Sequence, residues 1–186
     1  MKKVSVVFMT NRFSPVIESL HFCKDISLCA IVYCALPDST DRHLLDFCLQ
    51  HNLPVLHNID EFAHANIPKP DFLAVFSLHK ILSADEITLP KVAALNMHPS
   101  LLPLYKGANP WQEQFKARVK VSGFTIHKIT SDIDGGEIIS RKTFKIDYSL
   151  PHEMIIENAL RDVGGPLFCR VLSHYNKGWQ TTCSAK

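Results

Sequence analysis

Residues 92–103 read Val-Ala-Ala-Leu-Asn-Met-His-Pro-Ser-Leu-Leu-Pro, an apolar run that passes directly into a polar turn. The apolar residues predict a buried strand, and Asn96 and His98 stand at its end. Residues i and i+2 of a strand face the same side, so the carboxamide and the imidazole can converge on one reacting atom. An amide donor beside a histidine, which titrates near neutral pH, is a combination suited to acyl transfer.

A carboxylate further along the chain completes this candidate site. Asp134 lies within Ser131–Ile139, where a glycine turn comes directly before another apolar run. We expect it to orient His98 and to balance its charge. His127 is the strongest competing histidine, and we expect it on an adjacent wall of the site or on the sheet surface. Ser100 is predicted to form a turn rather than to act as a nucleophile, because no G-x-S-x-G elbow surrounds it.

Short apolar runs alternate with longer amphipathic segments in the first half of the chain. We expect strands at residues 4–9, 28–34, 54–56, 72–76 and 92–95, and helices at 15–23 and 38–50. Asp38-Ser39-Thr40-Asp41 supplies N-cap candidates for the second helix. Repeated strand and helix predict a doubly wound, mostly parallel α/β sheet with helices on both faces.

The second half of the chain has a different pattern. Residues 123–129 and 137–146 are β-rich runs on either side of the Asp-Gly-Gly turn, which predicts a hairpin-like or broken pair at the other side of the sheet. Residues 151–175 predict a closing helix that Gly164-Gly165-Pro166 would interrupt or kink. With no repeat or linker in the sequence, we expect a single domain over residues 1–186.

Composition and charge exclude several classes of partner. The formal charge of +2 is small, and lysine and arginine are scattered, so no nucleic acid is expected as a partner. No apolar stretch approaches the length of a membrane span, so no membrane is expected either. The N-terminal residues Met1–Thr10 have a basic start and a short apolar run without a cleavage site. They predict a first strand and a cytoplasmic protein.

The cysteines and glycines narrow the function further. The six cysteines contain no C-x-x-C pair, and several sit in apolar runs, so we expect reduced core residues and neither disulfides nor a metal site (Cys23, Cys29, Cys34, Cys48, Cys169 and Cys183). All seven glycines lie after residue 106, so the loop at residues 10–15 has none. A dinucleotide site or a P-loop needs glycine there, which makes NAD binding and NTP hydrolysis poor hypotheses.

Several of these segments together resemble one family. Residues 95–103, 105–110, 123–127 and 134–136 are similar to the folate-dependent formyltransferases, and the resemblance extends over residues 72–146. That family moves a formyl group from 10-formyltetrahydrofolate to an amine, or to water in the deformylase. The resemblance implies a Rossmann-like formyltransferase fold and one-carbon group transfer with 10-formyltetrahydrofolate as the donor.

The resemblance also implies roles for individual residues. Asn96 and His98 would stabilise the oxyanion formed when an amine attacks the formyl carbon, and Asp134 would position His98 or relay a proton through water. Leu102–Pro103 resembles a cis peptide in the family. The residues expected to bind folate form two opposite walls of a pterin pocket: Lys80, Ile81 and Leu82 on one side, and Ser131, Asp132 and Ile133 on the other. The residues expected to bind the acceptor are Asn11, Arg12, Gly107 and Asn109.

The acceptor stays open at this point. Phosphoribosylglycinamide formyltransferases carry a Gly/Ser/Asn-rich phosphate loop where this chain has the glycine-free loop, and a histidine where it has Asn109. Residues 105–110 look more like the tRNA, sugar and deformylase branches. We expect the acceptor to be a small amine, either phosphoribosylglycinamide-like, which would indicate purine biosynthesis, or an amino-sugar nucleotide. The assembly to consider is a homodimer. The alternatives are formyltetrahydrofolate deformylase, a hydrolase, and a non-catalytic relative that binds folate or a nucleotide.

Overall fold

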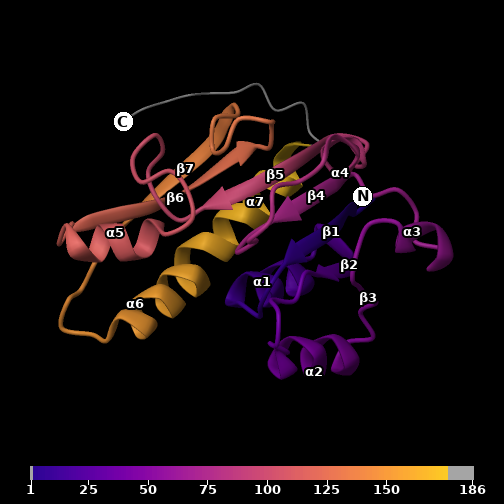
Figure 1. Cartoon of the computed structure of the whole chain (residues 1–186), viewed down its shortest axis with the longest axis horizontal. Coiled ribbons are helices and arrows are strands. Elements are labelled where there is room, and N and C mark those ends of the chain that lie inside the picture. Colours follow the sequence, from indigo (N-terminus) through magenta and orange to yellow (C-terminus); the bar gives the residue numbers. More distant parts are fainter. Residues whose placement is uncertain (1, 176–186) are drawn as a thin grey trace.

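The computed structural model describes residues 2–175, which form a seven-stranded sheet in the order β3-β2-β1-β4-β5-β6-β7 (Figure 1). Neighbours among the first five strands pair in parallel: β1 Val4–Thr10, β2 Ile26–Tyr33, β3 Val55–Leu56, β4 Phe72–Val75 and β5 Ala93–His98. The last two run antiparallel to their neighbours: β6 Val121–Lys128 and β7 Ile138–Lys145. This arrangement confirms the predicted doubly wound α/β fold and the antiparallel pair at one side of it.

Helices cover both faces of the sheet, but unequally. The helices are α1 Pro15–Phe22, α2 Arg42–Gln50, α3 Glu61–His64, α4 Ala84–Thr88, α5 Pro110–Lys116, α6 His152–Ala159 and α7 Gly165–Tyr175. One face packs its apolar side chains against α1, α2, α5 and α7, and the other against the short α3 and α4 with their loops. The thinly covered face therefore has room for a cavity beside the strand ends.

The helix expected at residues 151–175 is divided by a π-helical turn at Leu160–Gly164, so that α7 continues from α6 across the sheet (Figure 1). The N–H of Gly165 donates to the carbonyl of Leu160, one residue further back than in an α-helix. Pro166, which has no N–H, follows directly. The predicted interruption is confirmed.

The N-cap predicted for the second helix is Asp41, whose carboxylate accepts a hydrogen bond from the Leu44 N–H. The helix therefore begins at Arg42, later than the sequence pattern suggested. Within residues 2–175 no helix is long and apolar enough to cross a membrane. The cysteines described there are free. Cys48 is buried, and the other four are partly buried and pack against the core (Cys23, Cys29, Cys34 and Cys169). Cys183 lies outside the described residues.

Glycine in the first turn of α7 allows a close approach to α1. A Cβ on Gly165 would stand 2.6 Å from the Cβ of Ser19 and closer still to its Oγ. We therefore expect Gly165→Ala to destabilise the fold by about 1–3 kcal/mol in urea denaturation. Gly164→Ala is the matched control, because the atoms nearest to its Cβ lie at 3.3 Å and include the adaptable thioether of Met97. Equal stability of the two variants would contradict this account of α1–α7 packing.

Candidate active site

The carboxyl ends of β1, β4 and β5 border a cavity of about 430 Å³. Strand order reverses between β1 and β4, because β2 lies on one side of β1 and β4 on the other. Such a switch point leaves a crevice outside the strand ends, where doubly wound proteins bind ligands. The cavity is lined by five segments of the chain, at Arg12, residues 75–82, residues 96–99, residues 107–111 (without Asn109) and residues 127–134 (without Lys128 and Ser131). Its volume suits a small molecule.

Asn96, His98 and Asp134 meet at this cavity. Asn96 and His98 lie two residues apart on β5 and both line it, as the strand pattern predicted. Oδ2 of Asp134 lies 3.4 Å from Nδ1 of His98. The side chain of His98 is 5% exposed and that of Asp134 10% exposed, so both groups are largely removed from water. The roles assigned to them remain predictions.

His127 is a fourth member of the cluster and lines the cavity, which is one of the two positions expected for it. It sits opposite Asn96 where β6 pairs with β5. Its Nε2 lies 3.0 Å from Nδ2 of Asn96 and 3.4 Å from Oδ1 of Asp134, and its Nδ1 donates to the carbonyl of Lys128 at 2.9 Å. It therefore contacts both partners, and only the register between β5 and β6 could have revealed this.

The loop after His98 fixes the orientation of its ring. Nε2 donates to the carbonyl of Tyr105 at 2.7 Å, which leaves Nδ1 facing Asp134. The Ser100 hydroxyl donates to the carbonyl of Leu104 at 2.6 Å, so its predicted turn-forming role is confirmed. The Leu102–Pro103 peptide bond is cis, as the resemblance implied.

A buried glutamine holds the start of this loop and was not foreseen. Nε2 of Gln114 donates to the carbonyls of Pro99 and Pro110, both at 2.9 Å, and its Oε1 accepts from the Ser122 hydroxyl at 2.5 Å. Gln114 is 1% exposed, and both its amide nitrogen and its carbonyl oxygen are hydrogen-bonded. It ties the turn that follows His98 to α5 and β6.

Two glycines allow the turn that carries Asp134 to approach the rest of the site. The N–H of Gly107 donates to Oδ2 of Asp134 at 2.8 Å, and Gly107 has a φ of +94°, which other residues rarely adopt. Gly136 passes so close to the carbonyl of Lys128 that any Cβ would overlap it. Asp134 itself has a φ of +50°, a conformation that aspartate tolerates better than most residues.

Burial and charge act in opposite senses on the two central groups. Burial lowers the pKa of His98, and it outweighs the Tyr105 carbonyl and the Asp134 charge, which raise that pKa. Burial alone would raise the pKa of Asp134, but contact with His127, the Gly107 N–H and the charge of His98 together lower it. At neutral pH the site therefore holds a carboxylate beside a neutral imidazole whose Nδ1 lone pair is free.

The predicted folate-binding residues that line the cavity come from two separate segments of the chain. Lys80, Ile81 and Leu82 line the cavity on one segment, and Asp132 and Ile133 line it on the other. Ile81 is 76% exposed and Ile133 57% exposed, which offers apolar surface to a ligand. Ser131 is not part of the lining. The charge of Lys80 is paired with Glu86 at 2.5 Å.

Two of the four residues predicted to bind the acceptor line the cavity, and two do not. Arg12 and Gly107 line the cavity, whereas Asn11 and Asn109 do not. Asn11 is buried, with its amide bonded to the His79 ring and accepting from the Ser77 hydroxyl. Asn109 is the N-cap residue of α5. Among residues 2–175, no three histidine, cysteine or acidic side chains are grouped so that they could hold a metal ion.

Comparison with known proteins agrees with this geometry. The family model described as formyl transferase matches residues 55–172. The methionyl-tRNA formyltransferase of Thermotoga neapolitana is 31% identical over 153 residues, 76% of this chain and 44% of that protein. The formyltetrahydrofolate deformylase of Haemophilus influenzae is 28% identical over 124 residues, 67% of this chain and 42% of that protein. The chain thus spans less than half the length of the curated relatives it matches.

A solved structure extends the likeness to the whole fold. The phosphoribosylglycinamide formyltransferase from Anaplasma phagocytophilum superposes with a TM-score of 0.79 and covers 100% of this chain and 96% of that one. The two are 18% identical, so the match shows the shared fold alone.

The charge of Asp134 should be measurable at His98. Asp134→Asn keeps the size of the side chain but removes the charge that raises the pKa of His98, so that pKa should fall below its already lowered value. An NMR titration of the His98 ring measures this. Asp132→Asn is the control, because Asp132 is an exposed residue of the same turn. A larger effect from Asp132→Asn would show that the turn is misassigned.

Proposed function

Since this chain belongs to the formyl transferase family, we propose that it is an enzyme that transfers a formyl group from 10-formyltetrahydrofolate to the primary amine of a small acceptor. One observation supports this above all: a buried carboxylate, a neutral imidazole and a carboxamide meet at one end of a cavity of about 430 Å³. These are the groups that acyl transfer to an amine needs, a base for its proton and a donor for the developing oxyanion.

The rest of the cavity fits a pterin. Two segments of its lining, residues 80–82 and 132–133, carry the exposed apolar side chains of Ile81 and Ile133. A flat ring with an amide-like edge needs apolar faces of this kind, and backbone hydrogen-bond partners for its edge. When bound there, the folate supplies the formyl group.

His98 is the proposed base. Its Nε2–H remains on the Tyr105 carbonyl, so the ring keeps one orientation and Nδ1 takes the proton of the attacking amine. The imidazolium produced lies 3.4 Å from the Asp134 carboxylate, which stabilises its charge. Asp134 can then pass the proton on through water to the departing nitrogen.

Asn96 is the proposed donor to the formyl oxygen. One N–H of its carboxamide faces His127 at 3.0 Å, which leaves the second free for a ligand in the cavity. A donor aimed at a developing oxyanion is worth about 3 kcal/mol, or somewhat more than a hundredfold in rate.

Hydrolysis of the same donor is the second candidate. The cluster would serve a water molecule as well as an amine, and the relative from Haemophilus influenzae is a formyltetrahydrofolate deformylase. Incubation with 10-formyltetrahydrofolate and either phosphoribosylglycinamide, an amino-sugar nucleotide or no acceptor separates the two. Consumption that requires an amine supports transfer. Release of formate without an acceptor would favour the deformylase, and no consumption in any mixture would overturn both.

Loss of the proposed base should be severe. We expect His98→Ala to fold normally and to lower the rate of formyl transfer by at least about a hundredfold. Single-turnover rates and circular dichroism measure the two properties. His57→Ala, at an exposed histidine away from the cavity, is the control. Near-normal turnover in folded His98→Ala would refute the assignment.

The pH profile tests the protonation state of His98. Once kcat/KM is expressed per concentration of the neutral form of the acceptor amine, a neutral base with a lowered pKa should give a profile that is flat above about pH 6.5 and falls only below it. In Asp134→Asn this acid limb should move to still lower pH, while the plateau itself drops. A plateau that begins above about pH 7 would contradict a neutral imidazole base.

A further inference from the structure

The loop between β1 and α1 lies at the switch point of the sheet, beside the cavity. In doubly wound proteins the backbone N–H groups at this place, together with the positive end of the first helix, commonly hold a phosphate. To do so, those N–H groups must be free to donate to the ligand.

In this chain the N–H groups of three successive loop residues, Asn11, Arg12 and Phe13, already have partners. The N–H of Asn11 donates to the Ser77 carbonyl at 3.0 Å, and that of Arg12 to the Thr10 hydroxyl at 3.3 Å. The N–H of Phe13 donates to Oδ2 of Asp41 at 2.7 Å. The third partner is a carboxylate, so it brings negative charge to the loop directly after Arg12, which lines the cavity.

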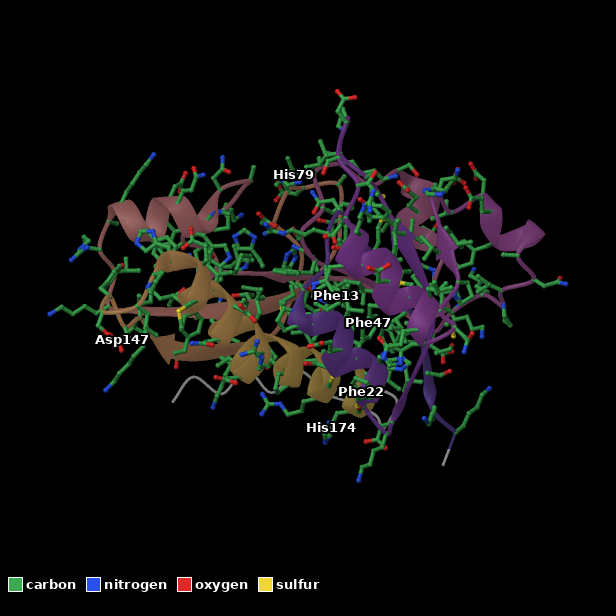
Figure 2. All side chains as sticks on the ribbon, turned by 90° about the horizontal axis from the view of Figure 1, so that it is seen from below. Phe13, Phe22, Phe47, His79, Asp147 and His174 are labelled. Atoms are coloured by element: carbon green, nitrogen blue, oxygen red, sulfur yellow. The ribbon has the colours of Figure 1, made fainter. Side chains whose placement is uncertain are left out.

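Asp41 and Phe13 are held in this arrangement from several sides. The N–H of Asp41 donates to the Tyr33 hydroxyl at 2.7 Å, and its Oδ1 accepts from the Leu44 N–H at 3.0 Å. The Phe13 ring stacks on His43 with centroids 3.8 Å apart and meets Phe47 edge-on at 5.6 Å. Figure 2 shows Phe13 next to Phe47, where α1 and α2 come together. The packing therefore keeps the Phe13 amide closed on Asp41.

We propose that Asp41 determines acceptor specificity: its carboxylate occupies the loop that would bind a phosphomonoester, and the site takes an amine that is recognised without a phosphate there. Arg12, which is exposed and lines the cavity, is the cationic side chain that this loop offers instead. The inference rests on the proposed function for the amine and adds which class of amine fits. Phosphate held by two or three charge-assisted hydrogen bonds would be worth more than about a hundredfold in affinity.

The test compares phosphoribosylglycinamide with its dephosphorylated form, ribosylglycinamide, by calorimetry on the whole chain. Wild type should bind the two within about threefold of each other. Asp41→Asn removes the charge and keeps one acceptor oxygen for the N-cap, so that its NH2 group then faces the Phe13 N–H. Asp41→Gly leaves the Phe13 N–H open to a ligand at little cost to the cap. Preference for the phosphorylated compound should therefore rise from wild type to Asn to Gly, reaching at least about tenfold.

Asp46→Asn is the control, because it removes the same charge from an exposed position on α2. Inorganic phosphate should also shift the Phe13 amide resonance in Asp41→Gly and not in wild type. A wild-type preference of about a hundredfold for the phosphorylated compound, or no rise in either variant, would overturn the proposal. Binding is measured without 10-formyltetrahydrofolate, so a failure of formyl transfer would overturn the proposed function alone.

Discussion

The antiparallel register of β6 against β5 determines where the polar groups of the site lie. Asn96 pairs with His127 and His98 with Thr125, so the polar residues of both strands share one face while Met97 and Ile126 enter the core behind them. A slip of one residue would turn His127 into that core. The same pairing carries the turn after β6 back over the end of β5, which brings Asp134 to His98.

Burial then makes the cluster chemically useful. A carboxylate and two imidazoles removed from water are costly unless they contact one another and hydrogen-bond donors. Here Asp134 is within 3.4 Å of both rings and accepts from Gly107, so it stays ionised although it is buried. His98 has a single strong acceptor in Tyr105, and burial prevails, so it stays neutral. The two groups reach different charge states in one environment, which is the condition for a base with a charge-balancing partner.

The sequence predicted the features that depend on local pattern. Alternating apolar runs indicated the parallel strands, and the i, i+2 spacing placed Asn96 and His98 on one side. Contacts between distant segments could not be predicted. The hydrogen bonds of Gln114 and the contacts of His127 depend on how β5 pairs with β6 and on where α5 packs. The short α3, α4 and α5 have too few turns to show a helical period. Asn11 was predicted to bind the acceptor because of its place in the first loop, but its side-chain amide is hydrogen-bonded to His79 and Ser77.

The two ends of the cavity are built by different means, and this bears on how far the fold predicts the substrate. The end that holds Asn96, His98 and Asp134 depends on the register between β5 and β6. The acceptor end depends on a loop whose N–H groups can each serve one partner at a time. In this chain the Asp41 carboxylate accepts the hydrogen bond of the Phe13 N–H. This contact lies outside the sheet and does not affect the order of its strands. The fold shared with the phosphoribosylglycinamide formyltransferase from Anaplasma phagocytophilum therefore does not identify the acceptor, which must be argued from Asp41 and its neighbours.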